Sequence, residues 1–442
     1  MSYPHRTLAT LSTSDVVVVG SGASGSLAAI AAARNGVRVL LLERYGFLGG
    51  TSTAVLDTFY GFYTPGSSPK KVVGGIADEV VHRLKGYGQC FERPNTYGAG
   101  TGVTYHPEYL KVVWDELARE AGVNVLLHCW VQDAAVSGAR IEALIVATKA
   151  GLQRIDGKVF IDASGDADLC FYAGAPVEVA GEFEPAQALT TTFRMSNVDV
   201  PRRQSVSKAR FHEIMSSSAE AYGLPRKEGS DHPTPVPNVT AANMTRVRSF
   251  ERRNGKVVNA TDPAFLSACE MEGRRQAIRY IRFLKDCVPG YESAELGSMG
   301  TQIGIRETRR ILGQYRLTRE DVLRARQFED QIGLCGAPIE DHAAGDSTRW
   351  IYLPEGQCVG IPYRTLLPRR VVNLLVCGRC FSATHDAQAS VRSMAQCMAM
   401  GQAAGTAAAM SVQLSRSPAD LPVNQLRQLL GTSGAILEAP NA

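Results

Sequence analysis

The chain has 442 residues, of which 45% are hydrophobic and 20% charged, with a formal net charge of +4. This length is about three times the ~150 residues of an average domain, so we expect two interleaved modules. The composition is typical of an α/β enzyme and excludes disordered and fibrous proteins. The small charge and the absence of long basic runs argue against nucleic-acid and membrane-surface partners. We therefore expect a small-molecule substrate.

The ends and the cysteines indicate an intracellular protein. The first residues lack the basic start and apolar run of a signal peptide, and no later stretch has 18 uninterrupted apolar residues. We therefore predict a cytoplasmic location. Ten cysteines are scattered singly, as is typical of reduced thiols, apart from a CxxC at Cys377 and Cys380. A redox pair or half a zinc site is one reading of it, but no second CxxC or histidine pair accompanies it, so we expect no metal.

The first folded segment has the pattern of a βαβ unit. Residues 15–19 (DVVVV) form a buried parallel strand, GSGASG follows, an alanine-rich helix ends at Gly36, and VRVLLLE forms a second strand that ends at Glu43. The spacing is that of a dinucleotide fingerprint, which needs this strand, helix and acid in addition to its glycines.

Each residue of the fingerprint has a separate task. Gly20 makes the tight turn, Gly22 lets the backbone approach a pyrophosphate, and Gly25 lets the helix pack on the strand. The helix N-terminus, at Ala23 and Ser24, then faces the phosphates. The Glu43 carboxylate accepts hydrogen bonds from a ribose hydroxyl. The segment therefore predicts a dinucleotide site.

The next segment continues the α/β pattern. An amphipathic helix is predicted over residues 107–121 and a strand over 123–131. Short alternating runs over 141–151 and 153–168 predict an antiparallel β-meander that returns to the main sheet.

The amino-acid composition changes between residues 181 and 350, where charged residues become more frequent and prolines cluster at 225–237. Long helices are predicted over 265–288 and from Thr318 onward. We predict a discontinuous dinucleotide-binding domain of residues 1–180 and 351–442, with 181–350 as an inserted α+β substrate or cap domain.

The C-terminal part is predicted to return to the main sheet. Residues 371–378 (VVNLLVCG) have the pattern of a buried strand. A helix over 391–410 carries alanine and glycine on several faces, which predicts close backbone packing.

Six motifs in order carry a resemblance to a known family. They are DVVVVGSGASG with Glu43, GFLGGTSTA, GGIADEVVHRL, IDASGDAD, GIRETRRI and NLLVCGRCFSATHDAQASVR. With them the chain resembles, nearly end to end, the glutathione-reductase-like FAD-dependent oxidoreductases, in the branch related to fumarate reductase and succinate dehydrogenase flavoproteins. The resemblance implies a Rossmann-like FAD-binding domain, FAD as cofactor, and a small organic substrate that meets the flavin under a cap.

The resemblance also implies further cofactor-binding residues. The residues after the second strand are expected to pass the pyrophosphate and flavin, Val131 to meet the adenine, and the alanine-serine-glycine-aspartate turn to lie beside the dinucleotide. A C-terminal glycine and its neighbour are expected to bind the flavin. Together the implied residues are Gly49, Gly50, Thr51, Ser52, Val131, Ala163, Gly165, Asp166, Gly378 and Arg379. Arg44, next to Glu43, and Ser393, near the start of the predicted C-terminal helix, are two further candidate cofactor-binding residues.

Two consequences follow for the C-terminal motif. Gly378 and Arg379 lie between the two cysteines of the CxxC, so the flavin motif accounts for the spacing. The helix that begins near Val391 would place a partial positive charge at the flavin pyrimidine, which would stabilise the reduced anion and raise its reduction potential.

Three residues are candidates for the chemistry. His385, in a predicted loop, and Arg392 lie in THDAQASVR, which loosely resembles the fumarate reductase loop that binds substrate carboxylates. His385 is a candidate acid or base, or else only hydrogen-bonds the flavin or loop backbone. Arg306 shares one predicted helical face with Arg309 and Arg310, where the three would clamp an anion or form a structural ion network. We favour the structural reading for that cluster.

The predicted reaction is hydride transfer between a small, polar or carboxylated substrate and flavin N5. The alternatives are a flavin-dependent C=C reductase, a monooxygenase and, from another class, a flavin-dependent RNA-modifying protein. A single GxGxxG argues against a pyridine-nucleotide reductase with two dinucleotide domains. Another acceptor or oxygen would take the electrons, and a homo-oligomer is compatible with the sequence.

Overall fold

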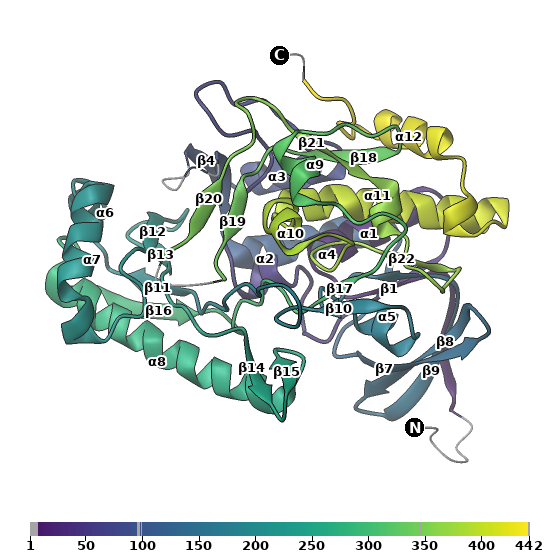
Figure 1. The fold of residues 1–442 in the computed structure, drawn as a ribbon, viewed down its shortest axis with the longest axis horizontal. Helices are drawn as coiled ribbons and strands as arrows, with labels where there is room; N and C mark the ends of the chain where they lie inside the picture. The colour runs from purple at the N-terminus through teal and green to yellow at the C-terminus, as the bar shows by residue number, and fades with distance from the viewer. Residues whose placement is uncertain (1–7, 95–97, 99, 344–346, 441–442) are drawn as a thin grey trace.

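The computed structural model describes residues 8–94, 98, 100–343 and 347–440. The largest sheet has seven strands, of which β1, β7, β8, β9 and β22 are labelled on the right of Figure 1. Four of its strands run parallel in the order β6-β2-β1-β9. The C-terminal half of β9 also pairs with parallel β22, while its N-terminal half starts the antiparallel meander β9-β8-β7. The strands are β1 Thr10–Val19, β2 Val39–Leu42, β6 Asn124–Leu126, β7 Trp130–Ser137, β8 Arg140–Thr148, β9 Gly151–Asp162 and β22 Leu374–Val376.

Both faces of the parallel part are covered. Along β1, Val16 and Val18 belong to one hydrophobic cluster, and Val17 and Val19 to another on the opposite face. The first cluster is shared with helices on one side of the sheet, which are α1 Ala23–Arg34, α3 Ile76–Gly86, α4 Pro107–Glu120 and α11 Met394–Leu414. Burial on both faces explains the unbroken valine and leucine runs of these strands.

The helices α1 and α11 pack backbone against backbone. A Cβ built on Gly401 would lie 2.1 Å from the Ser24 carbonyl oxygen, and one on Gly405 would lie 2.1 Å from that of Ala28. Only glycine allows this approach, so the close packing predicted from the small residues of the C-terminal helix is confirmed.

A second, four-stranded sheet lies at the other end of the molecule (Figure 1) and is called here the outer sheet. Its order is β12-β13-β11-β16, with all pairs antiparallel. It has its own hydrophobic cluster, drawn from residues between Phe193 and Ala294. Its elements and helices are β11 Phe193–Ser196, α6 Val200–Gln204, α7 Lys208–Tyr222, β12 Ser230–Pro233, β13 Thr240–Asn243, α8 Pro263–Cys287 and β16 Glu295–Met299.

Smaller elements connect these two parts. Strands β3, β5 and β4 form a three-stranded antiparallel sheet, and short two-stranded ladders pair β10 with β17, β14 with β15, β18 with β21 and β19 with β20. Their bounds, with the remaining helices, are α2 Thr51–Ala54, β3 Thr58–Phe59, β4 Cys90–Pro94, β5 Thr101–Tyr105, α5 Asp168–Tyr172, β10 Val177–Val179, β14 Phe250–Arg253, β15 Lys256–Asn259, β17 Arg309–Ile311, α9 Arg319–Leu323, β18 Gln331–Cys335, β19 Ile339–Asp341, β20 Arg349–Ile351, β21 Val359–Pro362, α10 His385–Val391, α12 Val423–Thr432, and two 3-10 turns at Tyr363–Leu366 and Pro418–Asp420.

Most predicted elements are present, and five differ. The strand over 123–131 is two strands, β6 and β7, because the chain turns at His128, which has φ 53°. The helix at Thr318 has its capping box but ends at Leu323. The helix over 391–410 is α11, which starts at Met394, and the predicted loop that carries His385 is the separate helix α10.

The fifth difference concerns the arginine cluster formed by Arg306, Arg309 and Arg310. Arg306 lies in irregular chain, and Arg309 and Arg310 are neighbours in strand β17, so the three share no helical face. The helical prediction was wrong because spacing alone does not distinguish a helix from an extended segment that is buried by its neighbours.

Two further findings concern membrane-spanning helices and the cysteines. No described helix combines the length and the apolar composition that crossing a bilayer requires. All ten cysteines are free thiols, and Cys377 and Cys380 are both buried.

Candidate active site

A large cavity lies between the carboxyl ends of the central strands and the outer sheet. It holds about 2180 Å³ of empty space, part of which is open to solvent. Its wall includes the fingerprint loop after β1, the ends of β2 and β9, and residues of β11, β12 and β13. The carboxyl edge of a parallel sheet is where such folds bind their ligands.

The fingerprint glycines provide the close approaches that their spacing predicts. Gly20 has φ +91°, and a Cβ there would lie 2.6 Å from the Ala163 carbonyl oxygen. A Cβ on Gly25 would lie 1.8 Å from the Gly20 carbonyl oxygen, so Gly25 serves the packing of α1 on β1. Gly22 lines the cavity and has no atom within 4 Å of its Cβ position. The cavity therefore reaches the backbone at the N-terminus of α1, as a pyrophosphate requires.

Glu43 is held in one position at the end of β2. Its Oε2 accepts hydrogen bonds from the Ser21 N–H (2.9 Å) and the Ser21 hydroxyl (2.6 Å), and its Oε1 accepts one from the Tyr45 N–H (2.9 Å). The side chain is buried yet borders the cavity. A fixed carboxylate at this point can accept further hydrogen bonds from ribose hydroxyls without reorganising.

Arg44 lies at the adenosine end of the cavity. Its guanidinium donates to Gln302 Oε1 (2.9 Å) and stacks over the rings of Tyr45 and Trp130, 4.9 and 5.4 Å from their centroids. The Tyr45 hydroxyl also donates to Gln302. Val131 lines the same wall. Planar and apolar groups are therefore gathered where an adenine is expected.

Asp166 does not reach the cavity and instead positions a residue that does. Its Oδ1 accepts from Arg379 Nη2 (2.7 Å) and from the Thr308 hydroxyl (2.6 Å). Burial alone would raise the pKa of Asp166, but the Arg379 guanidinium and these hydrogen bonds outweigh it and hold the pKa below its usual value. The ion pair orients Arg379 toward the cavity.

Among the predicted cofactor residues, Gly25, Gly49 and Asp166 lie behind the cavity wall, and Gly49 donates its N–H to the Ser21 carbonyl (2.9 Å). The others line the cavity: Gly20, Gly22, Ala23, Ser24, Glu43, Arg44, Gly50, Thr51, Ser52, Val131, Ala163, Gly165, Gly378, Arg379 and Ser393. Ser393 is the N-cap of the 21-residue helix α11 and makes no side-chain capping hydrogen bond. The residues present therefore suit an adenine dinucleotide that extends to the N-terminus of α11.

Two arginines stand together where the cavity passes α11. Arg306 Nη1 donates to the Ala188 carbonyl oxygen (2.8 Å). The Arg392 guanidinium makes no hydrogen bond and no ion pair with any described residue, and its Nε and Nη2 are buried. Burial, together with the charge of Arg392, lowers the pKa of Arg306 to about 9. The charge of Glu340 offsets only part of this positive charge, and the excess that is left is costly when buried and calls for an anion.

Glu340 and His342 complete this end of the cavity, and neither was predicted from the sequence. The two side chains are 3.1 Å apart, and His342 also bonds the Thr348 hydroxyl (3.0 Å). Burial, with the nearby charge of Arg306, lowers the pKa of His342 to about 3, so its ring is neutral. Burial alone would raise the pKa of Glu340, but His342 and the two arginines lower it to about 2.

His385 does not border the cavity. Its Nδ1 lies 2.9 Å from Glu307 and its Nε2 lies 3.2 Å from Asp341. Burial favours the neutral ring, but the hydrogen bonds with Asp341 and Glu307 outweigh it and raise the pKa of His385 to about 9. The structure thus makes His385 a buried cation between two carboxylates and does not bring it together with Arg306 and Arg392.

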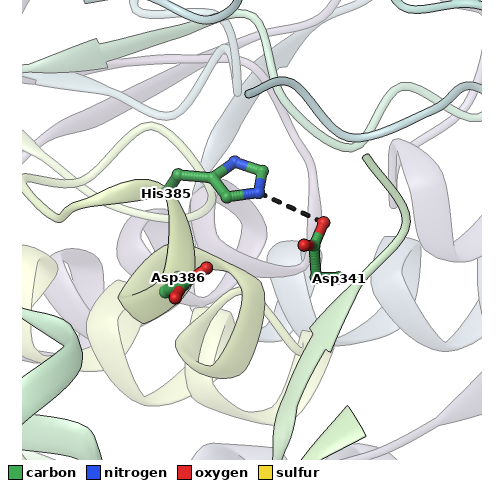
Figure 2. A group of neighbouring side chains, drawn as sticks. All are labelled: Asp341, His385 and Asp386. Atoms are coloured by element: carbon green, nitrogen blue, oxygen red, sulfur yellow. Dashed lines mark hydrogen bonds and ion pairs between the residues drawn. The ribbon is translucent and has the colours of Figure 1, made fainter. Parts of the chain in front are cut away.

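Asp341, His385 and Asp386 are close enough in space to resemble a metal site (Figure 2). Figure 2 shows the imidazole turned to Asp341, with Asp386 on α10 to one side. The carboxylates are already paired with arginines, because Arg349 bridges both and Arg319 lies 3.5 Å from Asp386. The cluster is therefore a charge-balanced ion network.

Arg309 and Arg310, which were predicted to share a helical face with Arg306, form structural contacts. Arg310 is buried, donates to the Ala383 carbonyl oxygen (2.8 Å) and pairs with Glu184 (2.7 Å). Arg309 pairs with Asp168 (2.5 Å). Arg309 and Arg310 therefore belong to a structural ion network, as was favoured from the sequence, while Arg306 lies apart from them at the cavity.

Sequence reasoning missed the polar residues that the outer sheet and the segment after α2 bring to the cavity. These are Asp57, Arg194 and His232. They belong to no motif and are far apart in the chain, so only the pairing of the sheets brings them together. Their one available signal was the lone histidine in the proline-rich stretch 225–237.

The fold and the cavity define a flavin-type dinucleotide-binding enzyme, and comparison with known proteins places it. A model of the family described as FAD dependent oxidoreductase matches residues 15–430. The chain belongs to this family, and its cofactor is FAD.

Individual relatives are more distant. The 4-oxocyclohex-2-ene-1-carboxylate 5-dehydrogenase of Sinomonas cyclohexanicum is 35% identical over 110 residues, which is 25% of this chain and 17% of that protein. The solved structure of the flavin-dependent brominase Bmp2 is similar with a TM-score of 0.50 at 15% identity, covering 95% of this chain and 84% of that one. The p-nitrophenol 4-monooxygenase PnpA of Pseudomonas putida DLL-E4 has a TM-score of 0.47 at 11% identity, with coverage of 95% and 84%. At such identities the structural likeness concerns the fold alone.

Proposed function

We propose that this protein is an FAD-dependent dehydrogenase or oxidase that takes a hydride from a small carboxylate, and that Arg392 and Arg306 bind the carboxylate group. The bound FAD supplies the two-electron acceptor at N5. Electrons then pass to oxygen or to another acceptor.

The observation that carries this proposal is the unpaired guanidinium of Arg392. Its Nε and Nη2 are buried without a hydrogen-bond partner, and it stands beside the second cation, Arg306. A guanidinium presents paired N–H groups that match a carboxylate in bidentate geometry. A bound carboxylate would supply the missing acceptors and offset the mutual repulsion of the two charges.

Glu340 limits what else can bind there. It is ionised and lies close enough to both arginines to raise their pKa values, although it forms an ion pair with neither. The local charge is then close to plus one without a ligand and near neutral with one carboxylate. A dianion such as a phosphate group would overcompensate this positive charge and leave the site negative.

One relative supports the same substrate class. The dehydrogenase from Sinomonas cyclohexanicum is named for a substrate that carries a carboxylate and a ketone on a six-membered ring. We therefore place small ring carboxylates with a carbonyl group first among the candidate substrates.

The test is anaerobic reduction of the bound flavin, followed by its absorbance. The panel contains small carboxylates, including 4-oxocyclohex-2-ene-1-carboxylate, each paired with its methyl ester, together with NADH and NADPH. We expect at least one acid to bleach the flavin and its ester to do so only at far higher concentration. Bleaching by NADH or NADPH alone would overturn the proposal, and equal efficiency of acid and ester would overturn the carboxylate assignment.

A further inference from the structure

A second polar pair borders the cavity, formed by His232 and Asp57. Asp57 follows α2 and precedes β3, while His232 belongs to β12 of the outer sheet. The His232 Nε2 and the Asp57 Oδ1 lie 3.0 Å apart, and the side chains are 12% and 7% exposed. Both line the cavity, so the pair joins the outer sheet to the segment that follows the dinucleotide loop.

The charge of Asp57 fixes the direction of this hydrogen bond. Burial alone would raise the pKa of Asp57, but His232 and the guanidinium groups of Arg194 and Arg93 outweigh it and hold the pKa below its usual value. Arg194 Nε lies 3.7 Å from Asp57 Oδ2. An ionised carboxylate only accepts hydrogen bonds, so His232 donates its Nε2–H to Asp57.

This hydrogen bond leaves the other ring nitrogen of His232 as a base. With the proton on Nε2, the neutral ring carries its lone pair on Nδ1. The Nδ1 makes no hydrogen bond to any residue that the structure describes. His342 also borders the cavity, but both of its nitrogens are engaged, by Thr348 and Glu340.

We propose that His232, oriented by Asp57, is the residue that takes up the proton released by the substrate, a role that rests on the proposed hydride transfer. One C–H bond of the substrate breaks, and its hydrogen leaves with the electron pair to the oxidised FAD. The atom next to this carbon also loses a hydrogen. That hydrogen goes to His232 Nδ1 as a proton, and the electrons of the broken bond form the new double bond. The imidazolium that results is stabilised by the Asp57 carboxylate.

The two groups of cavity residues then have separate tasks. Arg306 and Arg392 hold the substrate by its anionic group, while His232 handles the proton. His385, which the sequence made one candidate acid or base, has both nitrogens bound to carboxylates behind the wall. This division predicts that loss of His232 slows the chemical step without weakening substrate binding.

The kinetic test uses the FAD-loaded enzyme and rapid anaerobic mixing with 4-oxocyclohex-2-ene-1-carboxylate or its methyl ester, whichever reduces the wild type. The variants are His232→Gln and Asp57→Asn, with His82→Gln, an exposed histidine of α3, as the matched control. We expect the limiting rate of flavin reduction to fall by about 10² to 10⁴ in His232→Gln and to fall in Asp57→Asn, with the substrate dissociation constant kept. A limiting rate within about threefold of the wild type in His232→Gln would overturn the proposal.

A second measurement uses the FAD-loaded enzyme and needs no substrate. NMR of protein labelled with ¹³C and ¹⁵N on histidine, with the His232 signal assigned by its loss in His232→Gln, reports which ring nitrogen carries the proton. We expect the proton on Nε2 in the wild type and a changed tautomer balance in Asp57→Asn. A proton on Nδ1 in the wild type would overturn the proposed role of the His232–Asp57 pair. The proposed function is tested separately, because it would be overturned if no carboxylate and no ester reduced the flavin.

Discussion

The α-carbon of Gly401 in α11 faces the carbonyl oxygen of Ser24 in α1 so closely that a Cβ would lie 2.1 Å from that oxygen. Ser24 lines the dinucleotide end of the cavity, and its hydroxyl donates to the Cys377 carbonyl (3.4 Å). The packing of the two helices therefore sets the position of the loop that is expected to hold the FAD phosphates.

Substitution Gly401→Ala should destabilise the protein and weaken FAD binding. The added methyl group has no space, and overpacking of this kind costs about 1–3 kcal/mol. The matched control is Gly431→Ala in α12, where a Cβ meets no atom within 4 Å, and where alanine should be neutral or slightly stabilising. The measurements are the melting temperature and the release of FAD in both variants. Equal melting temperatures for Gly401→Ala and Gly431→Ala would contradict the packing argument.

Substitution Glu43→Gln should release FAD more readily. The amide has only one acceptor oxygen, so its NH₂ would face either the Ser21 donors or the Tyr45 N–H, and the charge that strengthens a hydrogen bond from the ribose is lost. A hydrogen bond to a charged group is worth about 1.5–3 kcal/mol. We expect the FAD dissociation constant to rise by about tenfold or more, measured by the fluorescence of released flavin. Glu142→Gln, on strand β8 outside the cavity, is the control, and an unchanged constant in Glu43→Gln would show that Glu43 does not contact the cofactor.

His385 should make the stability of the protein depend on pH. Its pKa rises from the usual 6.5 to about 9 on folding, so the stabilisation is complete below about pH 6.5 and is lost as the pH rises through 9. A shift of this size corresponds to about 3 kcal/mol. The free energy of urea unfolding of wild type minus that of His385→Gln should therefore shrink by roughly this amount between pH 6 and pH 10. His82→Gln controls for the exchange of a histidine for glutamine, and a difference for His385→Gln that is constant with pH would refute the buried imidazolium.

The sequence predicted best what depends on neighbours in the chain. The βαβ unit around Gly20 and Glu43 was read correctly because its strand, turn and helix follow one another. The position of Gly401 was not specified, but the density of small residues already indicated close packing.

The chemistry of the cavity was harder to read, because it depends on contacts between distant segments. His385 lay in a motif that loosely resembles a substrate-binding loop, yet Glu307 and Asp341 from two other segments enclose it as a structural cation. His232 had no motif, and its partner Asp57 precedes it by 175 residues. The register of the outer sheet places the pair at the cavity, and that register cannot be derived from local spacing.

The effect of α11 on the flavin stays a prediction. Ser393, Met394 and Cys397 of its first turn line the cavity, so the positive end of a 21-residue helix faces the cofactor site. The variant Ser393→Pro should lower the reduction potential of bound FAD, as measured by redox titration. An unchanged potential in a variant that still binds FAD would count against this electrostatic role.

The most direct test of the central claim compares Arg392→Gln with Arg210→Gln, a substitution at an exposed arginine of α7, in anaerobic flavin reduction. For the carboxylate that reduces the wild type, we expect Arg392→Gln to raise the concentration needed for half-maximal reduction by about a hundredfold, the equivalent of ~3 kcal/mol for a charge-assisted pair. The methyl ester should be affected far less, and Arg210→Gln should match the wild type. Equal losses for acid and ester in Arg392→Gln would contradict the assignment of a carboxylate to this guanidinium.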